Sequence, residues 1–201
     1  MASQQIVIIN TGCANISSVK FAVERLGTPV IVSDDMRVIQ KADKVFLPGV
    51  GSANAAMASI EKKRLVGCIQ SLTQPVLGIC LGMQLMVEKS QESLSDNTPC
   101  LSLMPGQVRR MQAGDLRLPH MGWNTVTPID NAPLFKNIDT GSYFYFVHSF
   151  AVAVSELTMA SCQYGMEFSA AIHKDNFFGV QFHPERSSDA GAQLLKNFID
   201  L

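Results

Sequence analysis

The chain has 201 residues, and 47% of them are hydrophobic, which is enough for one well-buried α/β domain but short for two. Its 16 basic and 17 acidic residues leave a net charge of −1, without the cluster of lysine and arginine that attracts nucleic acid or anionic lipid. We therefore expect one domain over residues 1–201 that acts on a small molecule, with no nucleic-acid partner and no membrane association.

Two further features concern the cellular environment. The first basic residue is Lys20, so the amino terminus lacks the charged region of a secretory signal, and the uncharged stretch 140–155 is broken by glycine, serine and histidine. Five cysteines, at positions 13, 68, 80, 100 and 162, form no CxxC pair and have no metal-ligand spacing with histidine. We expect a cytoplasmic protein with no metal ion and no cofactor.

The amino-terminal half alternates short apolar runs with segments of helical periodicity. Strands are expected at residues 6–9, 30–32, 45–47 and 76–79, and helices at 16–26, 36–42 and 52–72. Asn15 is the expected N-cap of the first helix, and Gly27 its left-handed terminating residue. Such alternation predicts a mostly parallel sheet with helices on both faces.

The carboxyl-terminal half is different. The signals weaken from about residue 90 to 119, which we interpret as an excursion from the domain. Strands are then expected at residues 143–150, 158–163, 169–173 and 177–182, with a hairpin turn at 174–176 and a closing helix at 188–201. The predicted fold class is therefore α/β and flavodoxin-like, with a mostly parallel central sheet flanked by helices and extra antiparallel strands in the C-terminal half.

Cys80 lies between two glycines in the stretch PVLGICLGMQ, residues 75–84. A buried structural cysteine needs no glycine beside it, but a cysteine on a sharp strand-to-helix turn does, because the backbone is strained there and neighbouring strands come close. Such a turn holds the thiol above the carboxyl edge of the sheet, where helical N–H groups stabilise a thiolate. We predict that Cys80 is a nucleophile, with a core cysteine as the alternative.

A thiol nucleophile needs a base, and four histidines compete for this role: His120, His148, His173 and His183. His183 precedes Glu185 by two residues, so an extended backbone would let the carboxylate orient the imidazole, and His173 has the same relation to Asp175. If strand 177–182 runs parallel to the strand before Cys80, His183 lies at the edge of the thiol, whereas His173 lies about 20 Å away. The predicted catalytic set is Cys80, His183 and Glu185.

The stretch PGVG, residues 48–51, ends another strand at the same predicted edge. Backbone N–H groups beside glycines at a helix start are able to point at a developing negative oxygen. We therefore assign an oxyanion role to this turn.

With PGVG, GICLGMQ and FGVQFHPE in this order, the chain resembles the class I, triad-type glutamine amidotransferases over its whole length. The resemblance implies a class I glutamine amidotransferase-like fold and hydrolysis of L-glutamine to glutamate and ammonia by Cys80, His183 and Glu185. The oxyanion hole would then consist of backbone groups of Gly49, Val50, Gly51 and Leu81. The glutamine-binding positions would be Gly51, Gln84 and the backbone of His148, Ser149 and Phe150.

Within that family, the chain is most similar to the branch of glutaminase subunits of imidazole glycerol phosphate synthase. The stretches NTGCANISSV, PGVGS, LPHMGWN and YFYFVHS carry this likeness. The branch implies a heterodimer with a (β/α)8-barrel cyclase subunit, to which ammonia is channelled for imidazole glycerol phosphate and AICAR formation in histidine biosynthesis. The implied interface contains Met121, Trp123, Asn124, Tyr143 and Arg186, the last at a position where many members carry lysine.

Trp123 is the only tryptophan, and it lies in the segment 118–124, which shows neither helical nor strand periodicity. Residue type alone leaves core and interface about equally open. Because the resemblance places this segment where the cyclase docks, we predict that Trp123 inserts into the partner.

Two other functions fit these residues less well. A stand-alone cysteine hydrolase or peptidase of DJ-1-like architecture would need neither glutamine nor a partner, but the HPE stretch argues against it. A non-enzymatic interaction subunit with a vestigial site is countered by the complete set of Cys80, His183 and Glu185.

Overall fold

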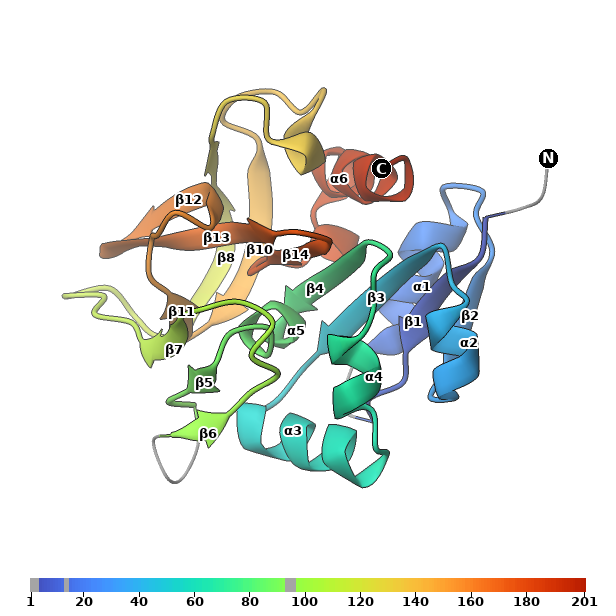
Figure 1. Cartoon of the computed structure of the whole chain (residues 1–201). Helices are drawn as coiled ribbons and strands as arrows, with labels where there is room; N and C mark the ends of the chain where they lie inside the picture. The colour runs from blue at the N-terminus through green and yellow to red at the C-terminus, as the bar shows by residue number, and fades with distance from the viewer. Residues whose placement is uncertain (1–3, 13–14, 93–96) are drawn as a thin grey trace.

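The computed structural model describes residues 4–12, 15–92 and 97–201, so Cys13 lies outside the described residues. A central sheet of eight strands, in the order β2-β1-β3-β4-β14-β13-β12-β9, carries helices on both faces (Figure 1). Its strands are β1 Ile6–Ile9, β2 Val30–Ser33, β3 Lys44–Gly49, β4 Val76–Cys80, β9 Thr127–Pro128, β12 Thr158–Tyr164, β13 Met166–Lys174 and β14 Phe177–Val180.

The sheet is parallel from β2 to β14 and antiparallel from β14 to β9. The predicted fold class, a mostly parallel sheet with antiparallel strands added in the C-terminal half, is confirmed. Asp175 forms the predicted hairpin turn between β13 and β14 with a φ of 54°.

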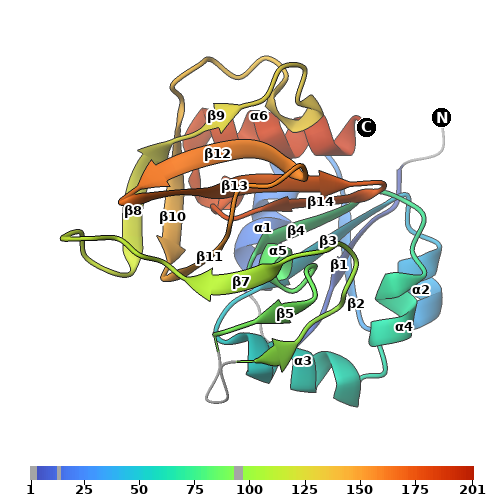
Figure 2. The same ribbon diagram turned by 60° about the vertical axis from the view of Figure 1, so that its left-hand side comes forward.

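The helices are α1 Ile16–Glu24, α2 Met36–Gln40, α3 Ala53–Lys62, α4 Val66–Gln70, α5 Leu81–Gln84 and α6 Ser188–Ile199. Helices α1 and α6 cover one face of the sheet, and α2, α3 and α4 cover the other (Figures 1 and 2). Strand β1 shows why both faces need cover, because Ile6 and Ile8 pack in the first layer and Val7 and Ile9 in the second.

Two expectations about helices are corrected. Residues 52–72 form two helices instead of one, because Arg64 takes a left-handed φ of 59° and the N–H of Leu65 bonds back to the carbonyl of Ile60, which ends α3. Asn15 is the residue before α1, but its side chain makes no capping hydrogen bond. Gly27, with a φ of 86°, has the predicted left-handed conformation.

The expected excursion, about residues 90–119, contains further strands. Strands β5 Lys89–Ser90, β6 Thr98–Pro99 and β7 Gln107–Arg110 join β11 Phe150–Val152 in a second sheet, in the order β11-β7-β5-β6 (Figure 2). The predicted strand 143–150 is therefore two strands, because the chain changes partners at Ser149.

Strand β10 Tyr143–His148 pairs with β8 His120–Thr125 in a separate two-stranded sheet. Residues 120–124 are therefore in a strand, although the sequence of segment 118–124 shows no strand periodicity. Short 3-10 turns complete the fold at Pro133–Phe135 (η1) and Pro184–Arg186 (η2). Among the described residues, no helix is long and apolar enough to cross a bilayer.

Candidate active site

Three strand ends meet at one edge of the sheet. Strand β14 lies parallel to β4 with Val180 opposite Ile79, and β3 lies on the other side of β4 with Gly49 opposite Cys80. The predicted parallel pairing of β14 is therefore confirmed, and the chain that leaves β14 brings His183 to the edge where Cys80 ends β4.

The glycines around Cys80 are explained by close backbone contacts. Cys80 has a φ of 54°, a strained value for a residue with a side chain, at the turn from β4 into α5. A Cβ atom on Gly82 would lie 1.8 Å from the carbonyl oxygen of Leu47, and one on Gly78 would lie 2.8 Å from the backbone of Gly82. Only glycine fits at these two positions, so this sharp turn depends on both.

His183 and Glu185 form a buried pair on the turn after β14. The Nδ1 atom of His183 lies 2.8 Å from Oε1 of Glu185, and the two side chains are 12% and 2% exposed. Because Nδ1 is engaged with Glu185, Nε2 is the nitrogen left for the thiol. Burial alone would lower the pKa of His183, but hydrogen bonds and charges of Cys80 and Glu185 outweigh it and raise this pKa to about 10.

A cavity of about 170 Å³ opens in front of the thiol, with room for one small molecule. Its walls bring together most of the residues named from the sequence, and they are Val50, Gly51, Cys80, Leu81, Gln84, Glu92, Val147, His148, Ser149 and His183. Gly49, Phe150 and Glu185 lie behind this wall. Gly49 pairs with Cys80, Glu185 supports His183, and the Phe150 carbonyl accepts a hydrogen bond from Gln84.

Sequence reasoning missed three residues of this site: Val147, which lines the cavity, Gln181 and Glu92. Gln181 is fully buried, lies 3.9 Å from the Cys80 sulfur through Nε2, and accepts a 2.9 Å hydrogen bond from Gln84 through Oε1. A polar residue inside the apolar stretch FGVQF was the signal. Glu92 lines the cavity, and burial raises the pKa of its carboxyl to about 7. It lies in the excursion, where nothing local marks it.

The competing histidine is held away from the site. The Nε2 atom of His173 lies 2.8 Å from the backbone carbonyl of Asp175, and the ring stacks on Phe178 at the hairpin end of β14. The carboxylate of Asp175 is therefore not its partner, and the analogy with the pair of His183 and Glu185 fails.

Three of the residues named for an interface are exposed together. Met121, Trp123 and Tyr143 are 62%, 52% and 59% exposed on the sheet of β8 and β10, so Trp123 is not a core residue. Arg186 is exposed on η2. Asn124 is different, because its amide points inward to His120 and to the carbonyl of Gln163.

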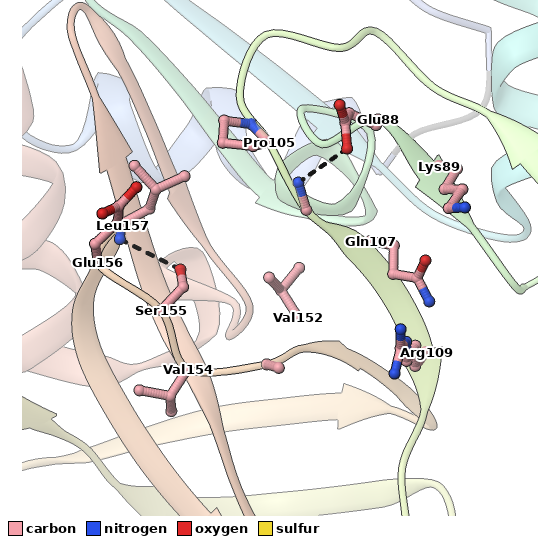
Figure 3. Close-up of a pocket in the computed structure, with 12 residues that line it drawn as sticks. Glu88, Lys89, Pro105, Gln107, Arg109, Val152, Val154, Ser155, Glu156 and Leu157 are labelled. Carbon is pink, nitrogen blue, oxygen red and sulfur yellow. Dashed lines mark hydrogen bonds between the residues drawn. The ribbon is translucent and has the colours of Figure 1, made fainter.

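A larger cavity of about 670 Å³ lies between β5, β7 and residues 152–157 (Figure 3). Glu88, Lys89, Arg109 and Glu156 line it together with apolar side chains, and the described residues of its wall include neither cysteine nor histidine. The smaller cavity is therefore the candidate active site, because a nucleophile and a base meet only there among the described cavities.

The fold and this site define a class of protein. The family model "Glutamine amidotransferase class-I" matches residues 7–201, and the chain belongs to this family. Among solved structures, a putative GMP synthase protein from Thermoplasma acidophilum is similar with a TM-score of 0.77 at 16% identity, covering 100% of this chain and 94% of that one. PurLQS from Thermotoga maritima has a TM-score of 0.71 at 16% identity, with 98% of each chain covered.

Closer relatives narrow the assignment. The imidazole glycerol phosphate synthase subunit HisH of Colwellia psychrerythraea is 57% identical, over 100% of this chain and 95% of the relative. HisH 1 of Vibrio vulnificus is 54% identical over 100% of both chains. Within the class I family, the chain belongs with these HisH subunits.

Proposed function

We propose that the chain is the glutaminase subunit of imidazole glycerol phosphate synthase. It hydrolyses L-glutamine to glutamate and ammonia on Cys80 and passes the ammonia to a cyclase subunit in histidine biosynthesis. The observation that supports this most is the meeting of Cys80, His183 and Glu185 at one cavity, in a chain 57% identical along its length to a HisH subunit.

In the first half of the reaction, the Cys80 thiolate attacks the side-chain amide carbon of glutamine. A C–S bond forms, and the carbonyl oxygen becomes an oxyanion that backbone N–H groups of Leu81 and residues 49–51 stabilise. As the C–N bond breaks, the His183 imidazolium donates its Nε2 proton to the departing nitrogen. Ammonia leaves and a glutamyl thioester remains on Cys80.

The second half uses the same imidazole as a base. Once Cys80 is acylated, the negative sulfur that helped to raise the pKa of His183 is gone, so neutral imidazole becomes accessible near neutral pH. His183 then takes a proton from water, the water oxygen attacks the thioester, and the C–S bond breaks to release glutamate and the thiolate. Glu185 keeps the ring oriented throughout.

Glu92 provides a test of how glutamine is recognised. We propose that its carboxylate binds the α-ammonium group, because it is the one acidic side chain among the described residues that line the cavity. Glu92→Gln is expected to raise KM for glutamine about 10- to 100-fold with little change in kcat, as for the loss of a charge-assisted hydrogen bond.

The pH dependence gives the control for this assignment. Because the raised pKa of Glu92 is about 7, its charge is lost as the pH falls through 7, and KM of the native protein is expected to rise there. In Glu92→Gln, KM should be flat from about pH 6 to 8. A variant that keeps the native KM, or the native pH profile of KM, contradicts the role of Glu92.

A docked partner follows from the chemistry of the product. Free ammonia in bulk water near neutral pH becomes ammonium, which has no lone pair for attack, so it must pass directly to its acceptor. The HisH relatives are subunits by name. We propose that this chain folds as a single domain over residues 1–201 and forms a heterodimer with a (β/α)8-barrel cyclase in the cytoplasm.

Trp123→Ala is expected to weaken binding of the cyclase by about 30-fold or more, because exposed aromatic residues dominate interface hot spots. Thermal unfolding should change little, since the side chain is 52% exposed. Ile31→Ala, at a 45% exposed residue on β2, an edge strand of the central sheet, is the matched control for affinity. A collapse in thermal stability with unchanged affinity would place the docking surface elsewhere.

The whole proposal is tested by copurification with the cyclase and by glutaminase assays with and without its nucleotide substrate. We expect weak hydrolysis of glutamine by the isolated chain and a large increase in the complex with nucleotide, because the partner favours the loop conformation that completes the oxyanion hole. Hydrolysis of peptides or esters in preference to glutamine would refute it.

A further inference from the structure

Two buried histidines face each other across the sheet of β8 and β10. His120 and His148 are opposite in register, 3% and 6% exposed, and Nδ1 of His120 lies 3.0 Å from Nε2 of His148. The reaction described above uses neither imidazole for proton transfer. Two buried rings in direct contact need an explanation, because each needs its hydrogen positions matched.

The proton positions follow from one end of the contact. Nδ1 of His148 lies 2.9 Å from the carbonyl oxygen of Phe150, which only accepts, so this nitrogen carries the proton. Nε2 of the neutral His148 ring is then an acceptor, and His120 must donate to it from Nδ1. Nε2 of His120 is left as an acceptor.

The hydrogen bonds of Asn124 lead to the same proton positions on His120. Nδ2 of Asn124 lies 3.3 Å from Nε2 of His120, and Oδ1 of Asn124 accepts a 2.8 Å hydrogen bond from the N–H of Thr125, which fixes the amide orientation. Asn124 therefore donates to His120. Burial lowers the pKa of His120 to about 4 and that of His148 to about 3, so both rings stay neutral at physiological pH.

This directed chain, Asn124 to His120 to His148 to the Phe150 carbonyl, ends in the glutamine site. His148 and Ser149 line the cavity of Cys80, and the Phe150 carbonyl also accepts a 2.9 Å hydrogen bond from Gln84. The two donors fill both lone pairs of that oxygen. The backbone proposed to hold glutamine is thus anchored by Gln84 on one side and by the histidine chain on the other.

This series of hydrogen bonds begins on β8, the strand that carries the exposed Met121 and Trp123. Successive side chains of a strand point to opposite faces, and on β8 His120 is buried and Asn124 partly buried, whereas Met121 and Trp123 are exposed. Ring stacking fixes His120 further, with Tyr164 at 3.9 Å and Phe146 at 4.8 Å between ring centroids.

We propose that His120 is a positioning residue for glutamine hydrolysis, which acts through His148 to hold the backbone of residues 148–150 and links that backbone to the docking strand β8. The inference rests on the proposed function. Loss of the N–H of His120 frees His148 to turn away from Phe150, whereas loss of the aromatic ring alone does not.

Two substitutions separate the hydrogen bond from the packing. His120→Phe keeps an aromatic ring between Tyr164 and Phe146 but removes both hydrogen bonds. His120→Asn loses the ring but offers an N–H close to the position of Nδ1. Ser169→Ala is the matched control, because it breaks the buried hydrogen bonds of Ser169 to Thr158 and to the Ala153 carbonyl without touching the chain of histidines.

The variants are compared in the complex with the cyclase and as isolated chains. In the complex, His120→Phe is expected to raise KM for glutamine at least tenfold with kcat within about threefold. The increase in kcat/KM that the cyclase produces should fall to a similar extent. His120→Asn should stay within about threefold of the native KM despite a lower melting temperature. In 15N spectra of the native chain, both rings should show the Nδ1–H tautomer.

The possible outcomes test the role of His120 and the proposed function separately. If the native complex hydrolyses glutamine and His120→Phe matches Ser169→Ala in KM and stimulation, the inference is wrong and the proposed function stands. If His120→Asn is more damaging to KM than His120→Phe, the role of His120 is packing alone. If the native complex does not hydrolyse glutamine, the proposed function is wrong and the inference falls with it.

Discussion

Cys80→Ser is expected to lower glutaminase activity of the complex by more than about 10³-fold while leaving the fold intact. The alcohol is nearly the same size as the thiol, so the tight turn between β4 and α5 should still form. A serine hydroxyl, however, has a much higher pKa than a thiol, so at neutral pH it keeps its proton and no anionic nucleophile forms beside His183. The measurement is kcat at saturating glutamine, with thermal unfolding as the check on folding.

Chemical labelling gives an independent control for the same assignment. An electrophilic glutamine analogue should label Cys80 and leave the other cysteines unmodified. Burial raises the pKa of Cys68, and it raises those of Cys100 and Cys162 to about 12, so these thiols are poor nucleophiles, and none of them lines the cavity of Cys80. Cys68→Ser should keep native activity. A label found by peptide mapping at any cysteine other than Cys80 overturns the assignment of the nucleophile.

The parallel part of the sheet could be predicted because its signals are local. Each of β1, β3 and β4 is a short apolar run buried on both faces, and each is followed by a helical segment. The position of β14 beside β4 could also be predicted, because His183 reaches the thiol of Cys80 only if the strand before it runs parallel to β4. The register of Val180 with Ile79 agrees with that reasoning.

Other elements were missed because their determinants are not local. Arg64 takes a left-handed conformation that its residue type does not announce, so the break between α3 and α4 left no signal in the periodicity. Strand β8 was missed because its inward positions are His120, Gly122 and Asn124, which do not register as an apolar face. His120 and Asn124 make polar contacts inside the fold, and those depend on strands far away in the sequence.

The same distinction applies to the site. Cys80, His183 and residues 49–51 lie at strand ends, where one motif fixes each position, and the structure brings most of them to one cavity. Glu92 reaches that cavity from the second sheet, and Gln181 matters through its contacts with Gln84 and Cys80. Such residues are specified by tertiary packing, which no stretch of sequence reports by itself.

His183→Ala is expected to lower glutaminase activity about 10²- to 10⁴-fold, roughly 3 to 5 kcal/mol of transition-state stabilisation, because both proton transfers pass through this ring. His173→Ala is the matched control and should be close to native. Its ring bonds to a backbone carbonyl at the hairpin end of β14 and stacks on Phe178, so its loss affects local packing only. The measurement is kcat/KM for glutamine in the complex, with melting temperatures for both variants.

The comparison of the two histidines tests the argument from the sheet edge directly. Both rings have a carboxylate two residues further along the chain, and only the direction of β14 relative to β4 separates them. In the structure, the ring of His183 bonds to its carboxylate, whereas that of His173 bonds to the Asp175 carbonyl. Equal losses in the two variants would mean that position at the carboxyl edge does not select the base. A severe loss from His183→Ala alone would show that strand direction, more than the spacing of histidine and acid, makes this imidazole the partner of Cys80.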